Sequence, residues 1–217
     1  MYRRAATACN WTVRRLPILG KPDQGYGRDE VLFLHVMFVC TGNICRSPMA
    51  ERLAAAYGGE LEIPDLRTSS AGVRAVIAHP IHQDAVPALE SLGGDASDFS
   101  ARQLTARIAA EADLILTMTR EHREAVLGVA PRKLRRTFTL IEAARIASRF
   151  DAQNVGDLAD FRPHLGALEL PDIPDPIGRS PDVFAAVGAQ IAELLPPIME
   201  LLRRSIGPTV ESPTWST

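Results

Sequence analysis

Residues 40–53 read CTGNICRSPMAERL, and this stretch decides the fold. Residues 31–39, just before it, are rich in β-branched and aromatic side chains, which predicts a short strand. Residues 49–57, just after Pro48, have a helical pattern that we expect to end at Gly58 and Gly59. The sequence here therefore predicts a strand, a tight loop and a helix in succession.

The same alternation continues along the rest of the chain. We predict further strands at residues 66–70, 113–118 and 137–140. We predict helices at residues 84–92, 104–112, 120–127, 141–150 and 181–204, the last bent or broken near Pro196 and Pro197, and a loop at residues 151–174. Strands that alternate with helices form a parallel sheet covered on both faces. The predicted fold class is therefore α/β, a small doubly wound domain with a four-stranded parallel sheet.

The two ends of the chain lack this pattern. Residues 1–30 mix arginine, proline and glycine without an apolar period, so we expect a flexible extension or a start codon assigned too early. Residues 31–204 form the expected folded domain. Residues 205–217, with Pro208 and Pro213, are expected to form a disordered tail.

Composition narrows the class of protein. The chain of 217 residues has a formal net charge of -2, which argues against a nucleic-acid partner. Its three cysteines do not suit a secreted disulfide framework, and no apolar run approaches the roughly 20 residues of a membrane helix. We therefore expect a cytoplasmic protein without a membrane partner. His79 and His82 have no further ligands nearby in sequence, so we expect no metal.

The loop itself has the chemistry of a phosphate site. A loop that ends at a helix N-terminus directs backbone N–H groups at one point, and the helix dipole favours an anion there. Arg46 is expected to grip two phosphate oxygens with its planar fork, while the same positive potential favours the thiolate of Cys40. The residues expected to bind phosphate are Thr41, Gly42, Asn43, Ile44, Cys45, Arg46 and Ser47.

Four residues in or near this loop are expected to support it. Gly42 is expected to allow a positive φ or a close backbone approach. Ser47 is placed to donate a hydrogen bond to the Cys40 sulfur, and Asn43 to hold a strained backbone. Arg102 is expected to support the loop from nearby. The alternative is a buried structural cysteine before an ordinary helix, which leaves the serine, the proline and the second cysteine unexplained.

These residues resemble the N-terminal motif of the low-molecular-weight protein tyrosine phosphatases. The resemblance continues through SSAG at 69–72, ARQLT at 101–105, ADLILTM at 112–118 and DPIGRS at 175–180, and spans residues 36–204. It implies a flavodoxin-like sheet, no cofactor and a phosphocysteine intermediate on Cys40. It also implies that Asp175 is the general acid and base, with Asp172 as the second choice.

The chain departs from this family at the rim of the expected site. Family members usually carry an aromatic residue where this chain has Ile177, and often a tryptophan within the stretch 73–76, where this chain has none. Related protein-arginine phosphatases usually have threonine in place of Ile44. Thioredoxin-coupled arsenate reductases need cysteines downstream, and no cysteine follows Cys45.

Two classes of function remain open. The first is a phosphatase that acts on a phosphorylated protein, with phosphotyrosine as the expected group. The second is a non-catalytic module that captures a phosphorylated partner. Cys45 also suggests a redox role, because it could form a disulfide with an oxidised Cys40, although simple packing would explain it equally well. The sequence does not define the physiological substrate or the oligomeric state.

Overall fold

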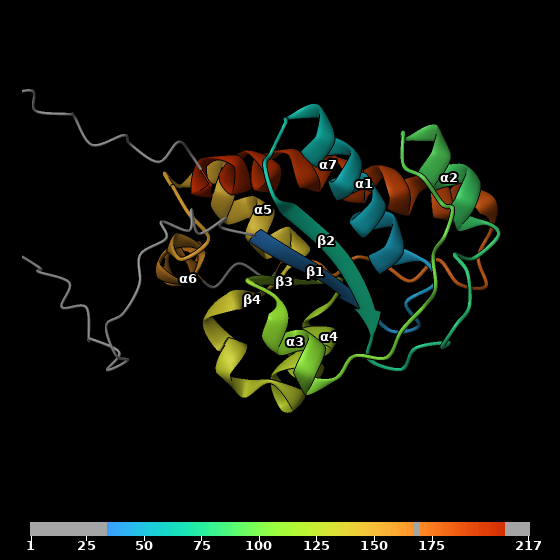
Figure 1. Ribbon diagram of the computed structural model, residues 1–217, viewed down its shortest axis with the longest axis horizontal. Helices are drawn as coiled ribbons and strands as arrows, with labels where there is room; N and C mark the ends of the chain where they lie inside the picture. The colour runs from blue at the N-terminus through green and yellow to red at the C-terminus, as the bar shows by residue number, and fades with distance from the viewer. Residues whose placement is uncertain (1–33, 167–169, 207–217) are drawn as a thin grey trace, which may run out of the picture. The chain divides into compact units, whose positions relative to one another are not determined.

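The computed structural model describes residues 34–166 and 170–206, which contain the predicted sheet (Figure 1). Its strands pair in parallel in the order β2-β1-β3-β4. The strands are β1 (Leu34–Cys40), β2 (Leu66–Gly72), β3 (Leu114–Thr117) and β4 (Thr137–Thr139). The four-stranded parallel prediction is thus confirmed. The expected extension at residues 1–30 and residues 207–217 of the expected tail lie outside the described residues. The start of the tail at residue 205 is wrong, because Ser205 is the last residue of α7 (Pro181–Ser205).

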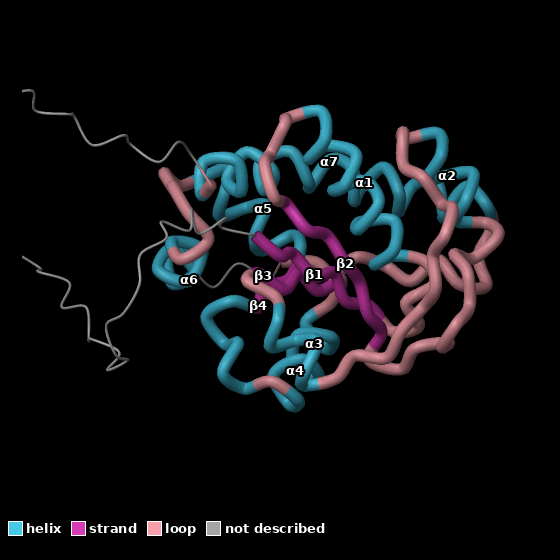
Figure 2. Tube along the Cα trace, in the orientation of Figure 1, coloured by secondary structure: helices cyan, strands magenta, loops and turns pink. Residues whose placement is uncertain are grey.

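Helices cover both faces of the sheet, so the strands run through the middle of the domain (Figure 2). One face is covered by α1 (Arg46–Glu60), α2 (Ala85–Ser91), α5 (Leu140–Arg149) and α7 (Pro181–Ser205). The other face is covered by α3 (Ala106–Glu111) and α4 (Arg120–Val129). Alternate residues of β1 enter the two cores, with Phe38 in one and Val39 in the other. This double burial explains the continuous apolar run of the first strand.

Helix α1 does not end where the sequence predicted. It continues through Gly58 and Gly59 to Glu60. A Cβ on Gly58 would lie 2.6 Å from Cδ2 of Leu66, so the glycine lets the helix pack closely on β2. The expected helix stop is therefore wrong because Gly58 serves packing between two elements.

Helix α7 is one continuous helix, so of the expected bend or break near Pro196 and Pro197 the break is wrong. Buried apolar residues on both sides of the prolines, such as Leu195 and Ile198, pack in the core beside α1 and α5. This packing outweighs the roughly 3 kcal/mol that a proline costs inside a helix. Within the described residues, α7 alone is long and apolar enough to cross a membrane, but half of its most apolar part is buried in the domain, as in a core helix.

The stretch 151–174 contains short helices rather than loop alone. These are α6 (Asp157–Phe161) and η2 (Arg162–Leu165). The Asp157 carboxylate accepts the backbone N–H groups of Gln153 and Asn154, and Leu158 is fully buried. Each helix is too short for an apolar period to be visible in the sequence.

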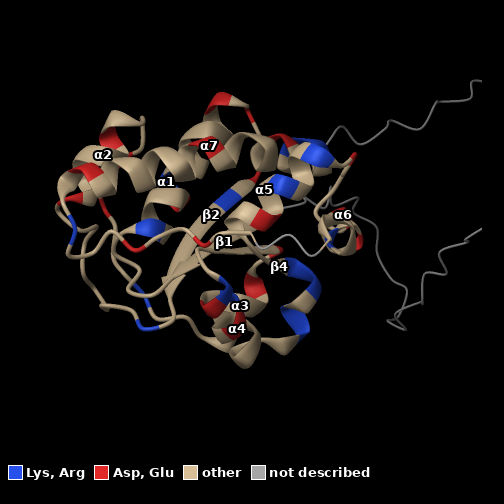
Figure 3. Cartoon of the chain, turned by 180° about the vertical axis from the view of Figure 1, so that it is seen from behind, with Lys and Arg blue, Asp and Glu red and all other residues tan. Residues whose placement is uncertain are grey.

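Charged residues of both signs are distributed along the helices (Figure 3). The most basic short element is η1 (Pro131–Arg136), which carries one lysine and three arginines. Its Arg135 pairs with Asp160 of α6, and Lys133 donates to the carbonyl of Ala112. These contacts tie η1 to its neighbours in the domain.

Candidate active site

The loop at residues 40–45 connects β1 to α1 at the carboxyl edge of the sheet. Its carbonyl groups are turned outward, where the segment after β2 pairs with them. The carbonyls of Cys40, Thr41, Gly42 and Ile44 accept backbone N–H groups of Val73, Arg74, Val76 and His82 at 2.7–2.9 Å. None of these bonds uses an N–H group of the loop, so its amides remain for another acceptor. This is the arrangement of an anion cradle.

Asn43 holds the strained point of the loop. It is fully buried and has a φ of 55°, which is uncommon for a residue other than glycine. Its Nδ2 donates to the hydroxyls of Ser47 (3.0 Å) and Ser70 (2.7 Å), and its Oδ1 accepts from the N–H of Arg102 (2.8 Å). The expected internal role of Asn43 and the supporting position of Arg102 are as predicted.

The close approach occurs at Gly72 rather than at Gly42. A Cβ on Gly72 would lie 2.6 Å from the carbonyl oxygen of Thr41, so no other residue fits without a shift of the loop. A Cβ on Gly42 would meet only ordinary contacts with Ile44 and Val76, and Gly42 has no positive φ. The glycine of the SSAG motif thus performs the packing role that we had expected of Gly42.

The two cysteines of the loop are buried and form no disulfide. The sulfur of Cys40 lies 3.0 Å from the hydroxyl of Ser47, which is the contact that the sequence predicted. Burial, followed by the neighbouring Cys40, raises the pKa of Cys45 to about 12. Cys45 is therefore a protonated thiol at neutral pH.

Arg46 connects the loop to the segment that carries the expected acid. Its Nη2 donates to Oδ2 of Asp175 at 2.5 Å, and its Nη1 to the carbonyl of Ile173 at 3.1 Å. The side chain of Arg46 is 5% exposed and that of Asp175 is 47% exposed. Asp172, the second choice, instead accepts the N–H of Arg120 at the start of α4 (2.9 Å). The structure thus brings Asp175, and not Asp172, to Arg46.

These residues surround a cavity of about 230 Å³. Cys40, Thr41 and Arg46 line its polar part, and Asp175 lies at its edge. Its rim is aliphatic and basic, as the sequence predicted, and consists of Ile44, Arg74, Val76 and Ile177. Val76 and Ile177 are each 44% exposed, so a substrate side chain would contact them directly.

The sequence analysis missed His122 of α4, which reaches the loop from 81 residues away. Its Nε2 lies 2.8 Å from Oγ1 of Thr41. Its side chain is buried, and Nδ1 has no hydrogen-bond partner among the described residues. Burial and the nearby charge of Arg46 lower the pKa of His122 to about 4. Only the order of the strands, which places α4 beside β1, would have indicated this contact.

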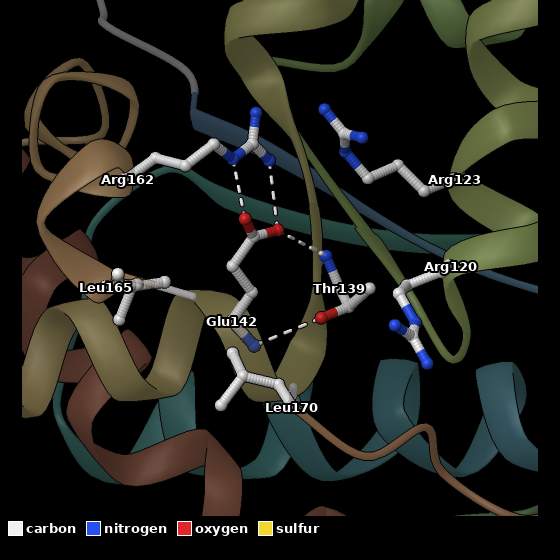
Figure 4. Close-up of a pocket in the computed structure, with 8 residues that line it drawn as sticks. Arg120, Arg123, Thr139, Glu142, Arg162, Leu165 and Leu170 are labelled. Atoms are coloured by element: carbon white, nitrogen blue, oxygen red, sulfur yellow. Dashed lines mark hydrogen bonds and ion pairs between the residues drawn. The ribbon is translucent and has the colours of Figure 1, made fainter. Parts of the chain in front are cut away.

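A second polar cavity of about 240 Å³ lies beside β4 and away from Cys40 (Figure 4). Arg162 forms two bonds to Glu142, at 2.6 and 3.0 Å, and its guanidinium stacks on the ring of Phe138. Glu142 also completes a capping box with Thr139 at the start of α5. Every group named here has a partner within the fold, so the arrangement is structural support.

In the described part of the chain, no three His, Cys, Asp or Glu side chains are grouped to hold a metal ion.

Comparison with known proteins assigns the family. The family model described as low molecular weight phosphotyrosine protein phosphatase matches residues 35–207. The chain is 31% identical to low molecular weight protein-tyrosine-phosphatase Etp of Escherichia coli K12 and 32% identical to Wzb of Salmonella typhi. These alignments cover 73% and 72% of this chain and 87% and 85% of the relatives. The chain therefore belongs to the low molecular weight protein-tyrosine phosphatase family, and it is a phosphatase of phosphorylated proteins.

Solved structures agree with this assignment. Wzb from Escherichia coli K30 in complex with sulphate has a TM-score of 0.59 and 27% identity, and the match covers 78% of this chain and 98% of Wzb. The YwlE arginine phosphatase from Geobacillus stearothermophilus has a TM-score of 0.60 and 28% identity, with 77% and 91% covered. Both branches of the family thus share the flavodoxin-like fold of this chain.

Proposed function

We propose that this chain hydrolyses phosphotyrosine in proteins, with Cys40 as nucleophile, Arg46 as phosphate clamp and Asp175 as general acid and base. The single observation that supports these roles best is the contact between Arg46 and Asp175 beside Cys40. It brings Asp175, which lies 129 residues from Arg46 in the sequence, to the loop that carries Cys40 and Arg46, at the carboxyl edge of the sheet where ligands of such folds bind.

The proposed reaction has two steps. First, the Cys40 thiolate attacks phosphorus, the bond to the leaving oxygen breaks, and Asp175 gives its proton to that oxygen. Second, a water molecule attacks the phosphocysteine, Asp175 takes the proton of the water, and the sulfur leaves as thiolate with release of inorganic phosphate. The loop amides and Arg46 stabilise the phosphoryl oxygens in both steps.

The direct test is release of p-nitrophenol from p-nitrophenyl phosphate without added metal. Wild type is expected to turn over, and Cys40→Ser is expected to have no activity while still binding orthovanadate, because the loop amides and Arg46 remain. A Cys40→Ser variant that retained turnover would contradict the assignment of Cys40 as the nucleophile. A wild type without turnover that still bound phosphopeptides would instead support the non-catalytic binding module.

The aliphatic rim bears on the substrate. An aromatic rim residue would contribute about 0.5–1.5 kcal/mol by stacking on the tyrosine ring, and Ile177 does not supply this. We therefore expect a weak preference for phosphotyrosine peptides over small aryl phosphates. Ile177→Tyr is expected to raise kcat/KM for phosphotyrosine peptides by about 3–10-fold, and an unchanged value would mean that the ring is recognised elsewhere.

A second candidate substrate is phosphoarginine in proteins, and the likeness to the YwlE arginine phosphatase structure favours it. Against it stands Ile44, which lines the cavity at the place where we expect threonine in the arginine branch. Parallel assays with phosphotyrosine and phosphoarginine peptides separate the two candidates. Phosphoarginine turnover that exceeded phosphotyrosine turnover in the wild type would reverse our choice.

We also propose that Cys45 protects the nucleophile from oxidation. Its thiol would condense with a sulfenic acid on Cys40, with loss of water, to give a disulfide that dithiothreitol reduces. The pKa of Cys45, raised to about 12, slows this condensation, because the attacking sulfur must first lose its proton. After brief peroxide treatment and reduction, wild type is expected to recover and Cys45→Ser to remain largely inactive. Equal recovery would leave Cys45 with a packing role alone.

Two further expectations belong to the same proposal. The phosphatase domain comprises residues 31–204, which nearly coincides with the matched residues 35–207. A chain that starts at Val31 is therefore expected to keep full activity. We also expect a cytoplasmic location, because three cysteines in 217 residues do not suit a secreted disulfide framework.

A further inference from the structure

The contact between His122 and Thr41 lies at the floor of the candidate active site. Thr41 is half-buried and lines the cavity together with Cys40 and Arg46. His122 approaches from α4, on the opposite face of the sheet from α1, and its ring is 4% exposed. A histidine that lies behind the cavity and contacts one of its lining residues can fix the orientation of that residue's hydroxyl group.

The surroundings of His122 determine which ring nitrogen carries the proton. With a pKa lowered to about 4 by burial and by Arg46, the ring is neutral at pH 7 and has one N–H. A proton on Nδ1 would leave a buried donor without a partner, which is rare and unfavourable in folded proteins. A proton on Nε2 instead leaves Nδ1 with only an unused acceptor lone pair, which costs less than an unused donor. Nε2–H therefore donates to Oγ1 of Thr41.

Arg46 is the second donor to the same hydroxyl. Its Nη2 lies 3.5 Å from Oγ1 of Thr41 while it also bonds to Asp175. A threonine hydroxyl has two lone pairs and one proton. With His122 and Arg46 both donating, the two lone pairs are used, and the hydroxyl proton is left to point away from both residues. The remaining direction is the cavity that Thr41 lines.

We propose that the Thr41 hydroxyl donates a hydrogen bond to a phosphoryl oxygen of the substrate, and that His122 is the positioning residue that fixes this direction. The inference rests on the proposed phosphatase function and adds a side-chain donor to the backbone amides of the loop. Such a donor matters most in the transition state, where charge on the phosphoryl oxygens must be stabilised by fixed dipoles. A neutral His122 is required, because its Nε2–H orients the hydroxyl without placing a further charge beside Arg46.

Matched variants test the hydroxyl. Thr41→Val keeps the shape of the side chain and removes the donor, and it is expected to lower kcat/KM for p-nitrophenyl phosphate about 10–100-fold. Thr41→Ser restores the hydroxyl and is expected to recover to within about 3-fold of wild type. Melting temperatures of both variants show whether they fold. A folded Thr41→Val with wild-type kcat/KM would overturn the role of Thr41.

His122 is tested through its dependence on Thr41. His122→Phe removes the donor, whereas His122→Gln retains an N–H donor near the position of Nε2. We expect His122→Phe to lower kcat/KM about 5–20-fold, His122→Gln to restore most of it, and the double variant Thr41→Val/His122→Phe to be no worse than Thr41→Val alone. Multiplicative losses in the double variant would show that His122 does not act through Thr41.

A spectroscopic measurement addresses the proton itself without reference to activity. Long-range ¹H–¹⁵N correlation spectra of the full chain at pH 7 distinguish the two neutral tautomers of a histidine. The expected result is a His122 ring protonated on Nε2 alone. A ring protonated on Nδ1, or on both nitrogens, would overturn the positioning role, whereas an inactive wild type would contradict the phosphatase function instead.

Discussion

Two arginine–carboxylate pairs lie in different parts of this domain, and they differ in how firmly each carboxylate is held. Arg46 gives one Nη2 bond to Asp175, whose side chain is 47% exposed. Arg162 gives two bonds to Glu142, whose side chain is 17% exposed, and a third to the carbonyl of Thr137. The carboxylate of the first pair is half-exposed and accepts one bond from its arginine, whereas the carboxylate of the second is enclosed and accepts the two bonds drawn in Figure 4.

The difference shows how the same chemical groups serve two purposes. An ion pair with a half-exposed partner is worth roughly 0–1 kcal/mol, so an incoming phosphate can displace Asp175 from Arg46. That exchange would release the carboxyl group of Asp175 toward the leaving oxygen. An enclosed pair loses several kcal/mol when one partner is removed, so Arg162 and Glu142 are suited to holding β4 against α5.

The largest expected effect is a loss of activity when Asp175, the carboxylate of the open pair, is replaced. Asp175→Asn keeps a polar group near Arg46 but cannot transfer a proton, so kcat for phenyl phosphate is expected to fall about 10²–10⁴-fold. The loss is expected to be smaller for p-nitrophenyl phosphate, whose leaving group needs less protonation. Steady-state kinetics on both substrates measure the difference.

The matched control is Asp172→Asn. Its carboxylate accepts the N–H of Arg120 and does not contact Arg46, so kcat is expected to stay within about 3-fold of wild type. A larger loss in Asp172→Asn than in Asp175→Asn would exchange the two assignments.

The second effect is a pH dependence of the free energy of unfolding, and it arises from His122 at the candidate active site. His122 titrates at about 4 in the folded chain and near 6.5 when unfolded. Between these values only the unfolded chain takes up the proton, so stability is complete above pH 6.5 and declines as pH falls toward 4. The loss by pH 4 is about 3 kcal/mol from this residue alone.

Denaturant unfolding of wild type and His122→Gln at pH 7 and pH 4 tests this estimate. The charged groups that act on His122 are Arg46, Asp175, Asp172 and Arg74, and they are present in both proteins. Their own titration therefore largely cancels in the comparison. A stability difference between the two proteins that did not change with pH would mean that His122 titrates normally.

The phosphate loop illustrates how far the sequence could lead. Residues 40–47 are contiguous, so their strand, turn and helix signals are local and predicted the cradle, the sulfur–hydroxyl contact of Cys40 with Ser47, and the strained Asn43. The link between Thr41 and His122 spans 81 residues and depends on which helix lies behind β1. The pairing of Arg46 with Asp175 spans 129 residues, and only the family motif suggested that these residues meet.

Local signals also misled where packing decides the outcome. Gly58 resembles a helix stop, yet its lack of a side chain allows α1 to pack against Leu66. Pro196 and Pro197 resemble a helix break, yet the buried residues around them keep α7 continuous. In both cases a local preference of about 1–3 kcal/mol is overridden by tertiary contacts that the sequence alone does not reveal.

The third effect belongs to the enclosed pair. Glu142→Gln leaves Arg162 partly buried without its counter-charge and weakens the capping box of α5. We expect a loss of about 2 kcal/mol in the free energy of unfolding and a melting temperature lower by roughly 4–8 °C. kcat at 25 °C is expected to change by less than about 2-fold. A large loss of activity in a folded Glu142→Gln protein would mean that the second cavity communicates with the first.

The smallest effect tests the exchange of partners at Arg46 directly. If Asp175 competes with phosphate for Arg46, removing its charge should favour the anion, because phosphate then displaces only a neutral amide. Asp175→Asn is therefore expected to lower the inhibition constant of inorganic phosphate by about 2–5-fold, the equivalent of a half-exposed ion pair, even as it lowers kcat. Glu142→Gln should leave this constant unchanged, since Arg162 is remote from Cys40. Competitive inhibition at fixed ionic strength measures both constants. Weaker phosphate binding in Asp175→Asn would show that the carboxylate holds Arg46 in place for the anion, and the contrast between an exchangeable pair and a fixed one would then fail.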